Sequence, residues 1–535
     1  MTLATASRSA SLDAAPSLYA ALEERILQRD QVGASAVYYD LLRAGRPLAE
    51  LVAEAVRIHA PYTHVPYHER IDDGYVNFVN NDHCLLSARA TINLAKLVPA
   101  AAAGLPMAQT IWYIPTGLDI WNQKIGRAPG HYTRGFQMPA GAPPSPVVYW
   151  PDQEPLTIDG DLKSRLGQWM TLVHRGNVIE AYRVFLGLMQ NPAERRAALA
   201  ELVFAGLIDV QDRAFQNRSY TTGHKSFRAR STVELGDFVG WDKAHDILYA
   251  GALDIAVGPR WYSTYEMACN AITVYIDGQA LHAVPYGGTS ERERALLANT
   301  APLDPAEADG LIDSLLNAHE PDWIERLSAL LRAGKGPRQV LDVLQIAAAQ
   351  VLVRTQDDVN FSIPQHCAEY CSTLGWFYDT FQHQQRVKLL YVAAAFINRN
   401  AWHQRNTGDL RPVDVRAPAG ADKMTAAQIL GGLDTAILAL DGPQSVAWTR
   451  AYLDSGADRA PLTERLALLG ARMGNDPHNQ ELAQCLIDDW RRNRGEGRDW
   501  LLLACAQHTA RHRKYGDFLD CARRFGAAMN VAGLA

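Results

Sequence analysis

The sequence predicts a mainly α-helical protein built from two degenerate copies of one helical unit, with long irregular loops. Apolar residues recur at three-and-four spacing in stretches such as PLAELVAEAVRIHA, PAERRAALAELVFAGLI and VKLLYVAAAFINR, which is the pattern of amphipathic helices. The pentapeptide LLRAG occurs at 41–45 and again at 330–334. Further along, Val76–Cys84 matches Val359–Cys367 without a gap, because both read VNF, four variable residues and then His-Cys.

These repeated patterns divide the chain into two halves that we expect to pack about a pseudo-twofold axis, by analogy with the contacts of symmetric dimers. The expected parts are a tail and first helix at 1–34, a first half at 35–300 with a histidine-rich loop at 59–68, a connection at 301–319 and a second half at 320–535. The alternative is two unrelated helical domains that share LLRAG by chance.

Irregular stretches with many prolines and glycines interrupt the helical pattern. They lie at 126–156, 283–305 and 404–421. Such segments are candidates for loops, lids or boundaries. We expect the first of them to cover a site between the two halves.

Composition narrows the classes of function. The net charge of -6 offers no basic surface for nucleic acid. Apolar runs such as WLLLACA fall well short of the roughly 20 residues that cross a bilayer. The N-terminus lacks a secretory signal pattern, and seven scattered cysteines without a CxxC pair fit reduced thiols. We therefore expect a cytoplasmic protein with a small-molecule substrate, and neither a nucleic-acid nor a membrane partner.

Histidines concentrate in the stretch RIHAPYTHVPYHERIDDGYVNFVNNDHCLLSAR, which contains His59, His64, His68 and His83. Prolines 61 and 66 disfavour helix at the residues before them. His59 is therefore expected to end a helix, and His64 and His68 to lie on or beside a fixed loop. Such a gathering of imidazoles is a candidate metal site.

The repeat pairs His83 with His366, and each is expected in the first turn of a helix. Asn81 and Asp82 are good N-caps before His83, and Ser362–Gln365 has the spacing of a capping box with a proline inside the start. The positive end of a helix favours neutral imidazole, which is the form that binds metals. The alternative for any one of these histidines is a hydrogen-bonded core residue.

A fainter similarity pairs His224 with His508. His224 is predicted to share a helical face with Phe227 and Glu234. A buried carboxylate needs a cation or donor, so Glu234 is a metal ligand, a base beside the metal, or the partner of an arginine such as Arg228 or Arg230. His508 is a candidate through its match to His224.

Other signatures of chemistry are absent from the sequence, since no GxGxxG, GxxxxGK[ST], HExxH or GxSxG motif occurs. The nucleotide cofactors that the first two motifs bind are therefore not predicted. An imidazole-rich, thiolate-poor ligand set suits a transition metal, and we favour iron over copper or zinc. The aromatic stretches TIWYIPTGLDIWNQ and GPRWYSTYE either wall a pocket for an organic substrate or fill the core.

The segments HAPYTHVPYH, NDHCLLSAR and TGHKSFRARSTVEL resemble the questin oxidase-like family. Its members are helical proteins with scattered histidines, and the named ones open the rings of polyketide-type aromatic substrates oxidatively. The similarity lies in the order of predicted helices and histidines along the chain, and it covers about a third of the first half. It implies an oxidoreductase and adds weight to His59, His83 and His224, while no catalytic residue is carried over from it.

The favoured hypothesis is a metal-dependent, oxygenase-like oxidoreductase that acts on a small, aromatic or other organic substrate between the two halves. One alternative is a metal-dependent hydrolase or lyase with Glu234 as the catalytic base. The other is a helical scaffold that binds a protein partner and has structural histidines.

Overall fold

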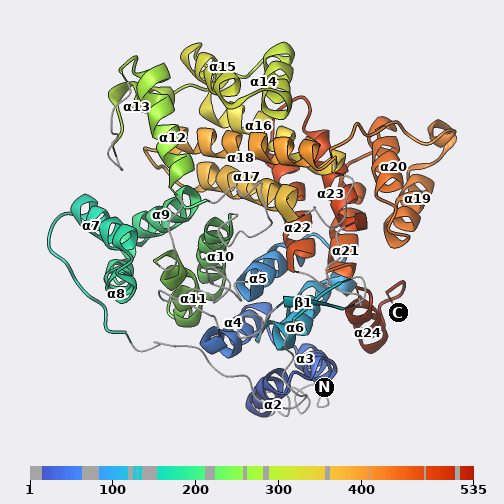
Figure 1. The fold of residues 1–535 in the computed structure, drawn as a ribbon. Helices are drawn as coiled ribbons and strands as arrows, with labels where there is room; N and C mark the ends of the chain where they lie inside the picture. Colours follow the sequence, from blue (N-terminus) through green and yellow to red (C-terminus); the bar gives the residue numbers. More distant parts are fainter. Residues whose placement is uncertain are drawn as a thin grey trace.

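Helices make up most of the described chain (Figure 1), which confirms the predicted mainly α class. The computed structural model describes residues 15–62, 83–118, 125–128, 131–134, 153–210, 223–256, 262–280, 288–355, 362–408, 410–474, 477–511 and 518–534. His64, His68 and most of the predicted covering loop at 126–156 lie outside these ranges.

The first 300 residues contain two groups of helices. Before the hairpin described below come α2 (Ala15–Leu27), α3 (Gln31–Arg43), α4 (Leu48–His59), α5 (His83–Leu94) and α6 (Leu105–Gly117). After it come α7 (Leu162–Arg175), α8 (Val178–Met189), α9 (Pro192–Ile208), α10 (His224–Val239), α11 (His245–Ile255), α12 (Ser263–Ala271) and α13 (Glu291–Leu296).

A short antiparallel hairpin separates these two groups. It consists of β1 (Ile125–Ala128) and β2 (His131–Arg134), with Ile125 opposite Arg134. The sequence predicted only irregular structure from residue 126 onward, so the hairpin is a local departure from that prediction.

The remainder of the chain is again helical. It forms α14 (Pro305–Asn317), α15 (Glu320–Arg332), α16 (Pro337–Arg354), α17 (Ser362–Thr380), α18 (Arg386–Asn406), α19 (Ala426–Leu438), α20 (Gly442–Asp454), α21 (Ala460–Arg472), α22 (Pro477–Arg492), α23 (Asp499–Arg511) and α24 (Asp520–Met529). Among the described residues, we find no helix that combines the length and the apolar character needed to cross a bilayer.

Local sequence sets several helix ends. The side chain of Asp304 accepts from the backbone N–H of Glu307, and the Glu307 side chain accepts from that of Asp304, which forms a capping box at the start of α14. Helix α7 ends at Arg175 and is followed by Gly176, whose φ of 72° lies in the left-handed region that glycine adopts without a steric penalty. These ends follow from residue type and require no tertiary contact.

Two hydrophobic cores hold the helices together, and each draws on both parts of the chain. One core is formed mainly by α7–α12 and α14–α18 and contains Trp169 and Trp323. The other is formed mainly by α2–α6 and α19–α24 and contains Tyr38 and Phe525. Neither core is therefore confined to one of the predicted halves.

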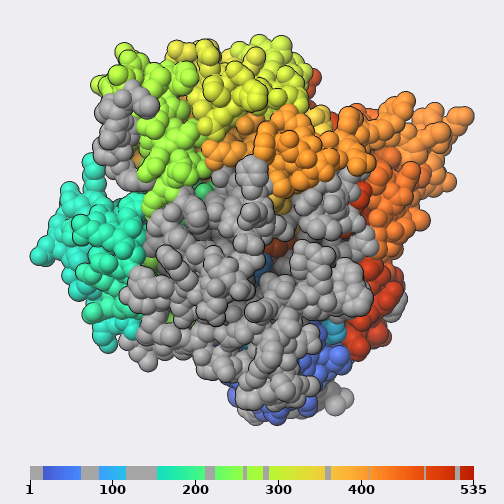
Figure 2. Space-filling model, viewed as in Figure 1, coloured from blue at the N-terminus to red at the C-terminus, as the bar shows by residue number. Residues whose placement is uncertain are grey.

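Helices α5, α10 and α17 contribute residues to both cores and so lie between them. With α22 they form a closed ring of helix contacts: α5 contacts α10 and α22, and α17 contacts the same two helices. This ring lies in the middle of the molecule (Figure 1). The segments that carry α7–α8 and α19–α20 lie at opposite edges of the same view (Figure 2).

Candidate metal centre

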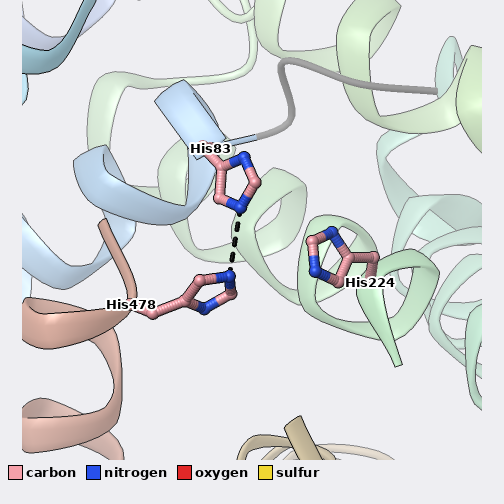
Figure 3. A group of neighbouring side chains, drawn as sticks. All are labelled: His83, His224 and His478. Carbon is pink, nitrogen blue, oxygen red and sulfur yellow. Dashed lines mark hydrogen bonds between the residues drawn. The ribbon is translucent and has the colours of Figure 1, made fainter. Parts of the chain in front are cut away.

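Four histidine side chains meet where α5, α10, α17 and α22 come together. The ring centroid of His478 lies 4.9 Å from that of His83, 5.5 Å from that of His224 and 4.7 Å from that of His366. His83, His224 and His478 project from three different helices toward one another (Figure 3). The side chains of His83, His366 and His478 are buried, and His224 is half-buried.

Three of these histidines lie in the first turn of their helices, whereas His366 is the fifth residue of α17 and lies beyond the first turn in which the sequence placed it. His83 and His224 are the first residues of α5 and α10, and His478 is the second residue of α22. Gly223 precedes α10 with φ 91°, and a Cβ at this position would lie 2.5 Å from the Phe227 ring. Glycine is therefore needed for the sharp turn that presents His224 to the cluster.

The ring nitrogens approach one another in pairs. Nε2 of His83 lies 3.0 Å from Nε2 of His478, and Nε2 of His224 lies 2.7 Å from Nε2 of His366. Within each pair, one nitrogen donates a hydrogen bond to the other when the ring carries a proton there. The same spacing suits metal binding, because two nitrogens at this separation can both lie about 2.0–2.1 Å from one cation.

Two overlapping groups of ligand atoms meet the geometric needs of a metal ion. In the first, ligand atoms of His83, His224 and His478 lie within 4.8 Å of one another. In the second, the same holds for His366, Glu369 and His478. His478 belongs to both groups and is the centre of the arrangement.

Two buried carboxylates flank His478 on the other side of its ring. Oε1 of Glu369 lies 3.0 Å from Nδ1 of His478, and Oε2 of Glu481 lies 3.4 Å from the same nitrogen. A carboxylate on the second ring nitrogen fixes the orientation of a metal-bound histidine and increases its basicity. Arg89 in turn donates to Oε1 of Glu481 at 2.9 Å.

The two carboxyl groups differ in their electrostatics. Burial raises the pKa of Glu369 well above its usual range, and the effect of the nearby His478 only partly opposes this rise. Burial acts on Glu481 in the same direction, but the contacts with His478 and Arg89 outweigh it, so the pKa of Glu481 is lower than normal. The negative charge of Glu481 is therefore already balanced by an arginine within the protein.

The structure brings together three of the seven predicted ligands, namely His83, His224 and His366. His59 is buried at the end of α4 and belongs to neither group of ligand atoms. His508 is also buried and outside both groups, with Nε2 3.0 Å from Oε1 of Gln365. His64 and His68 lie outside the described residues.

Glu234, the predicted base, is engaged elsewhere. Its carboxylate accepts from Nε of Arg230 at 2.8 Å and from Nδ2 of Asn93 at 2.7 Å. Although burial opposes it, the charges of Arg230 and Arg89 lower the pKa of Glu234 to about 2. This is the arginine partnership that the sequence left open as an alternative.

The sequence interpretation missed His478 and Glu369. A signal for both was present, because His366 and His478 each begin the pattern His-x-x-Glu, with the glutamates at 369 and 481. Residues three apart lie on the same face of a helix, so this pattern presents an imidazole and a carboxylate together. In the first half, the matching positions after His83 and His224 hold Leu86 and Phe227.

Comparison of the chain with protein-family models, with curated proteins and with solved structures gives no match. The geometry of the four-histidine cluster is therefore the basis for assigning a function.

Proposed function

We propose that this protein is a metal-dependent, oxygenase-like oxidoreductase that acts on a small organic substrate, with a metal held by His83, His224, His366 and His478. One observation carries the proposal: four imidazoles from four helices converge in a largely buried position, with ring nitrogens 3.0 Å and 2.7 Å apart in pairs. Buried ring nitrogens need partners, and neutral imidazole is the commonest metal ligand among the side chains.

The chemistry of the ligands favours a redox metal. Imidazole suits iron, copper, nickel and zinc, whereas thiolate is absent from both groups of candidate ligands among the described residues. We favour iron, because histidine together with a carboxylate such as Glu369 is a ligand set used by non-haem iron oxygenases. The metal would supply the redox chemistry, while the protein holds it, orients it and excludes water.

An aromatic side chain beside the cluster supports an organic substrate. Tyr113, from the aromatic stretch on α6, lies edge-on to His83 with ring centroids 6.1 Å apart. An aromatic ring at this distance can contact an apolar or aromatic molecule next to the metal. The resemblance to the questin oxidase-like family predicts the same kind of substrate.

The hydrolase or lyase alternative is weaker, because its proposed base, Glu234, is held by Arg230 and Asn93. The scaffold alternative treats the histidines as structural and relies on the hydrogen bonds within each pair. Metal content separates these interpretations, because a scaffold retains its fold and carries no stoichiometric metal.

We further propose that the two halves arose by duplication, in a register that pairs His224 with His478 in place of His508. The contacts α4–α5, α5–α6, α9–α10 and α10–α11 have counterparts in α16–α17, α17–α18, α21–α22 and α22–α23. In this register the pair formed by His83 and His478 corresponds to the pair formed by His366 and His224, as a pseudo-twofold axis requires.

A second pair of contacts supports the same register. Arg89 and Gln484 each lie six residues after the histidine of their own helix, and Nη1 of Arg89 donates to Oε1 of Gln484 at 2.7 Å. Ser372 and Arg230 occupy the corresponding positions of α17 and α10, also six residues after their histidines. Nη1 of Arg230 lies 3.3 Å from Oγ of Ser372.

The test is elemental analysis and visible spectroscopy of the full chain, purified without a histidine tag, beside the variants His478→Ala and His366→Ala. We expect a stoichiometric transition metal in the wild type and its loss from both variants. His245→Ala is the matched control, because His245 is exposed on α11 and outside both ligand groups.

The outcomes separate the candidate functions. Iron that reacts with dioxygen when reduced, with a change in visible absorption, supports the oxidoreductase. Stoichiometric zinc without redox activity favours the hydrolase or lyase. Trace metal that is equal in the wild type and all variants contradicts the proposal and leaves the scaffold.

A further inference from the structure

We infer that the histidine cluster holds a second cation beside the first, between His366, Glu369 and Nδ1 of His478. This inference rests on the proposed metal centre and extends it to two metal positions that share one imidazole. When both ions are bound, Nε2 of His478 holds the first ion together with His83 and His224, and His366 binds the second ion.

His478 has candidate metal ligands at both of its ring nitrogens. Its Nε2 lies 3.0 Å from Nε2 of His83, and its Nδ1 lies 3.0 Å from Oε1 of Glu369. The two groups of mutually close ligand atoms overlap only at this residue. An imidazole with candidate ligands at both of its ring nitrogens has the geometry that lets it bridge two metal ions.

The carboxylate of Glu369 needs a further partner. The residue is 1% exposed, and its Oε2 has no hydrogen-bond partner among the described residues. A buried carboxylate oxygen without a partner is costly, and such atoms in folded proteins call for an ion or a water. A cation next to Glu369 would satisfy this oxygen.

The charged side chains around His478 are also compatible with a cation beside Glu369. Arg89 and Glu481 form a buried ion pair whose charges cancel. Among the described residues, no arginine or lysine forms an ion pair with Glu369, whose one such contact is with the ring of His478.

The two halves differ in the residue that lies three positions after each histidine. This difference places the second metal position beside His366 and His478. Helices α17 and α22 each present a glutamate three residues after the histidine, whereas α5 and α10 present Leu86 and Phe227. The acidic side chains therefore gather beside His366 and His478. The other side of the cluster has only apolar residues at these positions.

Binding of both ions requires His478 to coordinate through both nitrogens as an imidazolate. Its remaining ring proton, and the proton of Glu369 if that carboxyl is neutral, would be released to solvent. No electron is transferred in this step, and each ion keeps its oxidation state.

The experiment uses the full chain, stripped of metal with a chelator and titrated with Cu(II). After gel filtration, copper per chain is measured by elemental analysis, and electron paramagnetic resonance reports how much of that copper is magnetically isolated. We expect the wild type to retain two Cu(II) ions with a signal well below that of the total copper, because an imidazolate couples the two spins.

Glu369→Gln should retain one Cu(II) ion with full signal intensity, because an amide keeps the shape of the side chain and loses the charge. Glu234→Gln is the matched control, since it removes a half-buried carboxylate that binds Arg230 outside the cluster, and it should retain two ions. Circular dichroism checks that each variant is folded.

A wild type that saturates at one isolated Cu(II) ion overturns the second position and leaves the proposed function intact. Two coupled ions retained in Glu369→Gln also overturn it, because Glu369 would then not be a ligand. Copper that fails to bind the wild type at all contradicts the proposed function itself. The wild-type titration decides the question even if a variant does not fold.

Discussion

Nη2 of Arg89 lies 2.9 Å from Oε1 of Glu481, and both side chains are 1% exposed. This ion pair connects α5 to α22, the two helices whose first turns carry His83 and His478. A guanidinium held in a fixed geometry by two acceptors restricts the helices it joins. The positions of two candidate ligands therefore depend on a contact deeper in the same helix pair.

Replacement of Arg89 by methionine should destabilise the protein by about 3–5 kcal/mol, because it leaves a buried carboxylate without its partner. The double variant Arg89→Met/Glu481→Leu should recover much of this loss, since it removes both charges. Urea unfolding of the two variants and the wild type measures the difference. A single variant within about 1 kcal/mol of the wild type would show that the pair is not essential to stability.

The carboxylate of Glu234 should make stability depend on pH in the acid range. Its pKa is about 2 in the folded protein, lower than in an unfolded chain, so its contribution is complete above the unfolded pKa and is lost as the pH falls toward 2. Glu234→Gln should lower the free energy of unfolding by about 3 kcal/mol at pH 7. Urea unfolding from pH 7 to pH 3 should show this gap narrowing below about pH 4.5, and a constant gap would contradict the assignment.

The carboxyl of Asp489 should act in the opposite direction. Burial raises its pKa to about 7, although Arg230 opposes the rise, so the folded protein binds a proton that the unfolded chain has released. Stability should therefore fall as the pH increases from about 4 to 7, by up to about 4 kcal/mol.

The variant Asp489→Asn should lack the part of this dependence that comes from Asp489. Its hydrogen bond with Ser372 can be retained by the amide. Parallel urea titrations between pH 4 and pH 8 compare the two proteins. Identical slopes for variant and wild type would mean that Asp489 titrates normally.

Replacement of His508 by alanine should leave the metal content unchanged. Its Nε2 interacts with Gln365, and loss of a buried hydrogen bond of this type costs about 1–3 kcal/mol. Elemental analysis and urea unfolding of His508→Ala, beside His83→Ala, measure both properties. Loss of metal from the His508 variant, equal to that from the His83 variant, would place His508 among the ligands.

The sequence by itself determined the helical class and the approximate starts of the helices that carry His83, His224 and His366. These features depend on periodic apolar residues and on nearby caps and prolines, so they can be recognised within a short window. The His-x-x-Glu patterns at 366 and 478 are equally local, but the register that pairs His224 with His508 leaves His478 without a counterpart.

Only the tertiary structure decided which of the histidines meet. His83 and His478 are far apart in the chain, yet they face each other because α5 packs against α22. The side chains of Glu234 and His508 are chemically just as able to bind a metal, but in the folded protein they contact Arg230 and Gln365 instead. Residue type decides what a side chain can bind, whereas the contacts between distant helices decide what lies within its reach.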